Sequence, residues 1–187
     1  MHMSAFLLAK ASGRNVLIAL GLVVLWVSAF NFFFTPHYQA ASSGFVPFDM
    51  QFPLTREMII IQLGAMTDAG PGAYVLFAAA DMAFPLIAAA FTILFWAWLV
   101  TKSGSTVLLG AFGRGWWMWG LLPAFCDLGE NVAFLKIILS HPEPMLREID
   151  VGVLLHRGKA VFLALSQTLT AILILTTIVM RVRKRIS

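Results

Sequence analysis

The sequence is poor in charged residues, and this scarcity excludes most soluble folds. Only 12% of its 187 residues are charged, whereas 60% are hydrophobic and the mean hydropathy is +0.87. Soluble domains carry about 25% charged and about 45–50% apolar residues. The chain is therefore predicted to be an integral membrane protein whose main partner is the lipid bilayer. Its net charge of +4 does not indicate a nucleic-acid partner.

Cysteine and histidine are too few, or wrongly placed, for several kinds of site. The one cysteine, Cys126, lies within a hydrophobic stretch, so a disulfide framework, a C-x-x-C motif and a thiolate metal cluster are excluded. All four histidines are predicted at membrane edges or in loops, which leaves no pair to hold a haem: His2, His37, His141 and His156. An acid cluster without histidine is a poor zinc or iron site. No metal or other cofactor is expected.

Four stretches are long enough to cross a bilayer, which takes about 20 apolar residues. We predict transmembrane helices over residues 15–34, 74–100, 116–140 and 159–180, so the fold class is all-α and residues 1–187 form a single four-helix transmembrane domain. The long first connection contains an apolar segment at 55–66 that Thr55 can cap. This segment is predicted to be a short outer helix that lies on the membrane or covers one end of the bundle.

Basic residues predict the orientation of the bundle. They flank the first stretch, occupy the connection 101–115 and follow the last stretch, and they are Lys10, Arg14, Lys102, Arg114, Arg181, Arg183, Lys184 and Arg185. The other two connections balance their basic residues with acidic ones. The positive-inside rule then places both termini and the connection 101–115 in the cytoplasm, as in a multi-pass protein of a bacterial inner membrane.

Acidic residues within the predicted spans point to a buried site. Asp127, Glu130 and Asn131 follow the spacing i, i+3, i+4, which places their side chains on one face of the third helix. Asp81 lies within the second predicted helix. A carboxylate at a helix centre costs about 2.5–3.5 kcal/mol to insert, so its presence favours a function over an accident.

The predicted depths bring polar groups of several helices into one layer. With a rise of about 1.5 Å per residue, Asp81, Glu130 and Asn131 lie about 13–16 Å below the outer ends of their helices. Gln167 lies about eight residues into the fourth helix, and Lys159 lies at the start of that helix. We predict that Asp81, Asp127 and Glu130 bind a ligand or ion, with Asn131, Gln167 and Lys159 completing the site. The alternative is a structural network in which Asn131 and Gln167 bond a protonated carboxyl and Lys159 neutralises another.

Two prolines predict interruptions beside these acids. Pro85 lacks an N–H, so the carbonyl of Asp81 loses its helical partner, and Pro123 does the same to Trp119, two turns before Asp127. Broken helices next to carboxylates are typical of ion and substrate sites in membranes.

The same residues carry a resemblance. Asp81-x-x-Phe84-Pro85 and Pro123-x-x-x-Asp127-x-x-Glu130-Asn131, together with Phe48-Asp49-Met50-Gln51-Phe52, resemble an uncharacterised family of bacterial four-helix membrane proteins over residues 45–140. Where that family has Gly-Arg before the tyrosine, this chain has Ala69-Gly70-Pro71-Gly72. The resemblance implies the fold and location but no activity. A weaker likeness, without a shared motif, links the chain to the four-helix sterol-isomerase and sigma-2-receptor superfamily.

Three functional hypotheses follow from the sequence. The first is a membrane protein that binds or translocates a cation, a proton or an amphiphilic small molecule in an acidic pocket. The second is a non-catalytic subunit of a larger membrane complex, whose carboxylates hold helices together or meet a partner's cation. The third is an isomerase-like enzyme that modifies a lipid by acid–base chemistry, with one protonated and one ionised carboxyl.

Overall fold

The computed structural model describes residues 2–143 and 145–186, and every regular element in that part of the chain is a helix. The predicted all-α class is confirmed. In chain order the elements are α1 His2–Lys10, α2 Gly13–Ala29, η1 Phe30–Phe34, α3 Thr35–Ala41, η2 Phe48–Met50, α4 Arg56–Gly64, α5 Gly70–Asp81, α6 Phe84–Ser103, α7 Thr106–Gly113, η3 Trp116–Leu121, α8 Leu122–Leu139 and α9 Leu146–Ile186. The segment η1 is a π-helix, whereas η2 and η3 are 3-10 helices.

The first apolar helix is longer than predicted and contains a π turn. α2, η1 and α3 follow one another without a break and form a candidate membrane span over Gly13–Ala41. The π turn η1 ends just before Pro36, which cannot donate a hydrogen bond to the carbonyl of Phe32. Phe30 and Asn31 of this wide turn line the cavity described below.

α5 and α6 are two halves of one apolar rod that is interrupted at Met82 and Ala83. The interruption predicted from Pro85 is confirmed, and α5 ends at Asp81. Pro85 and Pro123 both lie in the first turn of a helix, α6 and α8, where a missing N–H leaves no bond of that helix unmade. Pro123 begins α8 directly after the 3-10 segment η3.

The last helix corrects the sequence interpretation most. Residues 146–158 were expected in a connection, but α9 begins at Leu146 and continues to Ile186 over 41 residues. Ile149, Val153 and His156 follow helical spacing and are buried, whereas charged neighbours such as Asp150 point outward. The amphipathic first turns of α9 pack on α8. Because they contain charged residues, they do not have the uniformly apolar pattern that predicts a membrane span.

Three helical rods are long and apolar enough to cross a membrane: Gly13–Ala41, Gly70–Ser103 and Leu146–Ile186. The third predicted span, 116–140, does not qualify on these grounds, because Asp127, Glu130 and Lys136 lie within the 18 residues of α8. Three candidate spans, and not four, are therefore what the structure supports.

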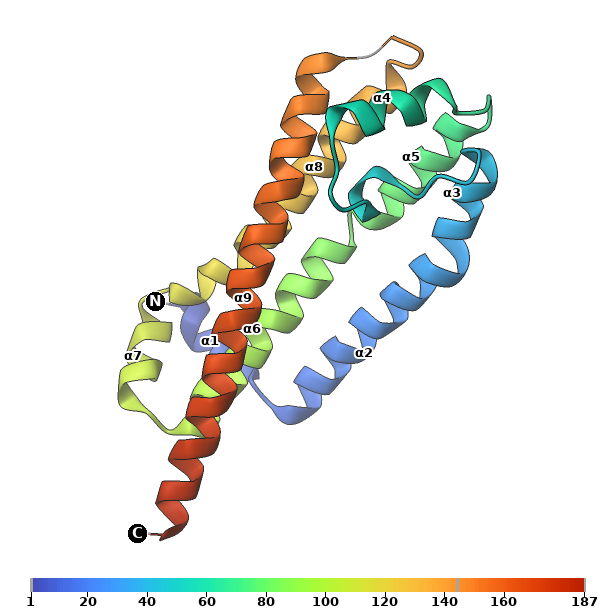
Figure 1. Ribbon diagram of the computed structural model, residues 1–187. Helices are drawn as coiled ribbons and strands as arrows, with labels where there is room; N and C mark the ends of the chain where they lie inside the picture. The colour runs from blue at the N-terminus through green and yellow to red at the C-terminus, as the bar shows by residue number, and fades with distance from the viewer. Residues whose placement is uncertain (1, 144, 187) are drawn as a thin grey trace.

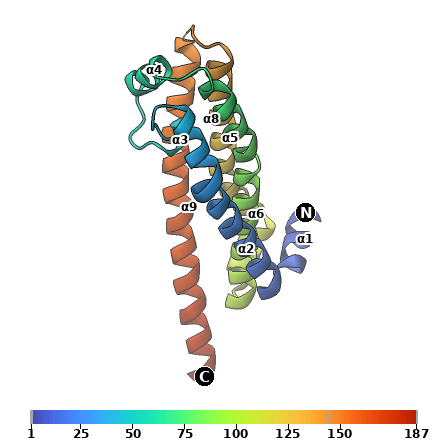
Figure 2. The same ribbon diagram turned by 90° about the vertical axis from the view of Figure 1, so that its right-hand side faces the viewer.

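α6 is the central helix of the assembly in Figures 1 and 2. α2 and α9 both pack on α6, and α8 packs along α9 and against α5 and α6. Within the described residues, α2 and α9 form no comparable interface with each other. The short helices α1 and α7 lie at the end of α6 opposite to α4 (Figure 1), and α9 runs beyond its neighbours to the C-terminus.

The first connection folds into a cap over one end of the bundle. α4 begins after Thr55, whose side chain accepts a hydrogen bond from the Met58 N–H, in the region predicted at 55–66. Ile59 is fully buried against the ends of the long helices. Gln62 donates to the hydroxyl of Tyr38 at 2.7 Å, which ties α4 to α3. The cap also places the segment η2 against α8.

Candidate functional site

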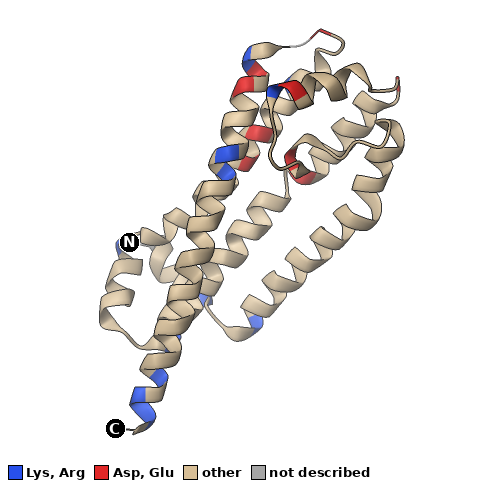
Figure 3. Cartoon of the chain, viewed as in Figure 1, with Lys and Arg blue, Asp and Glu red and all other residues tan. Residues whose placement is uncertain are grey.

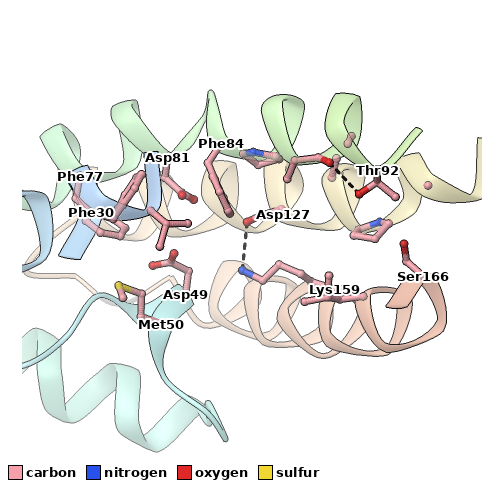
Figure 4. A pocket seen from close by; sticks show the side chains of 18 of the residues that line it. Phe30, Asp49, Met50, Phe77, Asp81, Phe84, Thr92, Asp127, Lys159 and Ser166 are labelled. Carbon is pink, nitrogen blue, oxygen red and sulfur yellow. Dashed lines mark hydrogen bonds and ion pairs between the residues drawn. The ribbon is translucent and has the colours of Figure 1, made fainter. Parts of the chain in front are cut away.

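A cavity of about 370 Å³ lies between α2 and α9, below the cap. Most of its lining is apolar, but three carboxylates and one ammonium face it (Figure 4). The lining residues are Val27, Phe30, Asn31, Asp49, Met50, Phe77, Asp81, Phe84, Pro85, Ala88, Ala89, Thr92, Gly120, Pro123, Ala124, Asp127, Lys159, Leu163 and Ser166.

Asp81 is fixed at one side of the cavity by Asn131. The Asn131 amide Nδ2 donates to Asp81 Oδ2 at 2.6 Å, and both residues are buried. The bond joins the end of α5 to the middle of α8, which confirms that these two polar positions converge. Because Asn131 carries no charge, it orients the Asp81 carboxylate without neutralising it.

Lys159 of α9 contacts both acids of the third predicted helix, Asp127 and Glu130. Its ammonium Nζ lies 3.2 Å from Asp127 Oδ1 and 2.9 Å from Glu130 Oε2. The Glu130 carboxylate is fully buried, so an ammonium at this distance offsets a charge that water cannot reach. One lysine thus holds two carboxylates, and the structure brings together five of the six residues predicted for the site.

His156 is a residue of the site that the sequence analysis misplaced. It was expected at a membrane edge or in a loop, but it is buried on α9 and its Nδ1 lies 2.8 Å from Glu130 Oε1. Its other ring nitrogen, Nε2, is buried without a hydrogen-bond partner in the described part of the protein. The spacing His156-x-x-Lys159 repeats that of Asp127-x-x-Glu130, and this repeat was the signal available in the sequence.

Gln167 was predicted in the site, and the structure does not place it there. Its side chain is exposed on α9, whereas its neighbour Ser166 is buried and lines the cavity. Successive residues of a helix are about 100° apart, so Ser166 shares a face with Lys159 and Leu163 and Gln167 does not.

Asp49 is the second residue that the sequence analysis missed. It comes from η2 in the cap, and its Oδ1 is buried without a hydrogen-bond partner among the described residues. Burial raises the pKa of Asp49 well above its ordinary value of 3.8, and the carboxylate of Asp81 raises it further. The signal in the sequence was an acid between two large apolar residues, Phe48 and Met50, in a connection read as solvent-exposed.

Negative charge is in excess at this site. Lys159 forms its ion pairs with Asp127 and Glu130, and no ion pair within residues 2–143 and 145–186 involves Asp49 or Asp81. Those two carboxyls face the cavity and are free to meet a positive group. The described residues contain no group of three His, Cys, Asp or Glu side chains arranged to hold a metal ion.

Comparison of the chain with protein-family models, curated proteins and solved structures found no match. The functional argument therefore depends on the geometry of the cavity.

Proposed function

We propose that this protein binds a membrane amphiphile with a cationic head group, and that the cavity between α2 and α9 is the binding site. The observation that carries the proposal is the pair Asp49 and Asp81, two carboxyls that face a largely apolar cavity of about 370 Å³ without a cationic partner. An apolar lining with a few convergent polar groups is typical of sites for small organic molecules.

The shape of the lining supports an amphiphile over an inorganic cation or a proton. Val27 of α2 and Leu163 of α9 both line the cavity and are both exposed, and these two helices pack on α6 without a comparable interface with each other. We propose that the cavity opens between them at the level of the lipid chains. An inorganic cation such as Ca²⁺ takes 6–8 oxygen ligands and gains nothing from aliphatic and aromatic walls.

The membrane placement is part of the same proposal. We propose that η3 and α8 together form a fourth span, because the two acids of α8, Asp127 and Glu130, are paired inside the bundle with Lys159 and His156 instead of facing lipid. Figure 3 shows the acidic residues gathered toward the α4 end, where basic residues also lie, and basic residues alone at the opposite end. The positive-inside rule then puts both termini in the cytoplasm and the cap outside a bacterial inner membrane.

A matched pair of amphiphiles tests this function. In nanodiscs, decylammonium should bind at least about tenfold more tightly than decanol, since only the cation gains from the carboxylates. Asp81→Asn keeps the acceptor for Asn131 but removes the charge, and it should weaken decylammonium binding about tenfold or more. Glu57→Gln makes the same change at an exposed position and should have no effect.

Titration calorimetry, with empty nanodiscs subtracted, measures these affinities. Gln167→Leu is a further control, since Gln167 lies outside the cavity, whereas Ser166→Leu should fill it and weaken binding. Equal affinities for decylammonium and decanol, or an unchanged affinity in a folded Asp81→Asn variant, would contradict the proposal.

An acid–base enzyme acting on a lipid is the second candidate, and the contact between Glu130 and His156 favours it. This pair connects through Lys159 to Asp127, which faces the cavity, so a proton donor and an acceptor lie near any bound molecule. Mass spectrometry of extracted lipids after incubation with the protein distinguishes the two candidates. An enzyme should produce a changed lipid that Glu130→Gln abolishes, whereas a binding protein should return its ligand unaltered.

A further inference from the structure

Three phenylalanine rings form one side of the cavity next to its unpaired carboxyls. The rings of Phe30 and Phe77 meet edge to face with centroids 5.0 Å apart, and the ring of Phe84 lies 6.3 Å from that of Phe30. They come from η1, α5 and α6, so three separate helices contribute to one aromatic wall. All three residues line the cavity.

Asp49 and Asp81 lie among these rings. Figure 4 shows them reaching the cavity from opposite sides, Asp49 from the cap and Asp81 from α5, with Phe30, Phe77 and Phe84 around them. Asp81 Oδ2 is occupied by Asn131, and Asp49 Oδ1 has no donor among the described residues. The site therefore offers negative charge next to aromatic surface.

This combination suits one kind of cation. A primary ammonium carries three N–H donors and is strongly hydrated, so it loses much hydration on entering a largely apolar cavity. A quaternary ammonium has no N–H donors, and its methyl groups pack against aromatic faces, which attract the positive charge. Carboxylates beside aromatic rings then supply charge without the need for directed hydrogen bonds.

We propose that the head group bound here is a quaternary, trimethylammonium-type cation, held between Asp49, Asp81 and the rings of Phe30, Phe77 and Phe84. This inference rests on the proposed amphiphile-binding function and narrows its ligand class. Two sources supply such a group: a simple quaternary amphiphile, or a lipid whose trimethylammonium is joined to a phosphate.

The protonation of Asp49 should make the affinity for the cation depend on pH. Burial raises the pKa of this carboxyl, so the empty site retains a proton above the usual range for an aspartic acid. The charged groups that face it are Asp81 on α5, Asp127 and Glu130 on α8, and Lys159 on α9. A bound cation favours the ionised form of Asp49, so binding releases a proton and the affinity increases with pH.

A series of ten-carbon amphiphiles in nanodiscs tests the inference. Decyltrimethylammonium should bind about threefold to tenfold more tightly than decylammonium, as expected for a desolvated cation–π contact. Its affinity should increase by up to about tenfold per pH unit while Asp49 is protonated. Because the quaternary probe has no proton to lose, such a dependence belongs to the protein, and Asp49→Asn should abolish it.

Phenylalanine variants identify the aromatic contribution. Phe84→Leu and Phe30→Leu should each remove most of the preference for the quaternary cation while leaving decylammonium binding nearly unchanged. Phe125→Leu alters an exposed phenylalanine on α8 and should keep the preference. Thermal unfolding confirms that each variant is folded, and two independent positions keep the test valid if one of them destabilises the protein.

The outcomes separate this inference from the proposed function. If decylammonium binds as tightly as decyltrimethylammonium, or if Phe84→Leu and Phe30→Leu keep the preference, the quaternary site is wrong and the amphiphile site remains. If neither cation binds the folded protein more tightly than decanol, both are wrong. Decylphosphocholine distinguishes the two sources. It should bind as tightly as decyltrimethylammonium if the ligand is a phosphate-bearing lipid. It should bind more weakly if the ligand is a simple quaternary amphiphile, because the negative charge of the phosphate then lies near Asp81 and Asp127.

Discussion

At the scale of single residues, Asp49 is a carboxyl whose ionised form is unfavourable in the folded protein. The carboxyl is removed from water and faces other acids, so its pKa is raised and its ionised form is destabilised. An acid that binds its proton more tightly in the folded than in the unfolded chain lowers stability once the pH exceeds its unfolded pKa.

Asp49→Asn should therefore stabilise the ligand-free protein at neutral pH. For the unmodified chain, the free energy of unfolding should decrease as the pH rises from about 4 toward the raised pKa of Asp49, because the unfolded state releases that proton first. The variant has no such proton, so its profile should be flatter and its free energy of unfolding at about pH 7 should exceed that of the unmodified chain. Thermal unfolding in detergent between about pH 5 and 8 measures this difference.

Glu57→Gln serves as the control for this experiment. Glu57 is exposed, and its pKa is lowered by hydrogen bonds to its own backbone and to Thr55. Removing it should not produce the stabilisation expected for Asp49→Asn. An Asp49→Asn protein that is less stable than the unmodified chain at neutral pH would show that the Asp49 carboxylate makes a favourable contact in the empty site.

At the scale of elements, the interface of α8 with α9 positions most of the polar cluster. Gly152 of α9 lies against the buried ring of Phe134 on α8, and a Cβ at this position would approach Phe134 Cε1 to 2.4 Å. The absence of a side chain lets the two helices approach closely. His156 and Lys159 lie one and two turns further along α9, so this contact sets their distance from Glu130.

Gly152→Ala should destabilise the protein although alanine favours helices. Overpacking a buried contact costs about 1–3 kcal/mol, more than the roughly 0.5–1 kcal/mol that alanine gains over glycine within a helix. Gly110→Ala on α7 is the matched control, because nothing lies within 4 Å of its added methyl group, and it should be neutral or stabilising. Thermal unfolding of the two variants compares them directly, and equal stability would show that Phe134 moves aside freely.

The elements also show how far the sequence specifies the site. Spacing alone predicted that Asp127, Glu130 and Asn131 share a face, and Pro85 predicted the break beside Asp81, because both follow from the geometry of a single helix. The error at Gln167 arose because the rotation of α9 about its axis depends on packing with α8, which hydropathy does not report.

The two missed residues have a different cause. Asp49 and His156 belong to the cap and to the charged first turns of α9, segments that hydropathy assigned to solvent. Their burial depends on contacts between segments far apart in the chain, such as the packing of α4 on α9 and the bond from Gln62 to Tyr38. Such contacts leave no local pattern in the sequence.

At the scale of the whole molecule, the distribution of charge assigns a direction to the chain. Every Asp and Glu lies between Asp49 and Asp150, whereas both ends of the sequence carry only basic residues. In space, the acidic residues gather toward the cap together with some basic ones, whereas the other end carries only basic residues (Figure 3). A membrane that excludes translocated basic residues favours one orientation of such a molecule.

Cysteine labelling tests that orientation. In a Cys126→Ala background, Thr67→Cys beside the cap should react with a membrane-impermeant thiol reagent in intact bacterial cells. Ser105→Cys, at the end that carries α7, should react only after the membrane is opened. Mass spectrometry measures the extent of labelling, and the reverse pattern would place the cap in the cytoplasm.

The packing of α2 and α9 on α6, but not on each other, has a consequence for how affinity is measured. A ligand that enters between these helices is drawn from the hydrocarbon, so its relevant concentration is a mole fraction in the bilayer and not a molarity in water. A longer alkyl chain partitions more strongly into the bilayer, which makes the apparent binding free energy from water more favourable by about 0.8 kcal/mol per CH₂, even if the cavity makes no contact with the added carbon. Doubling the lipid at fixed total ligand halves the occupied fraction of a weakly filled site. Comparisons between head groups therefore require equal chains and equal lipid.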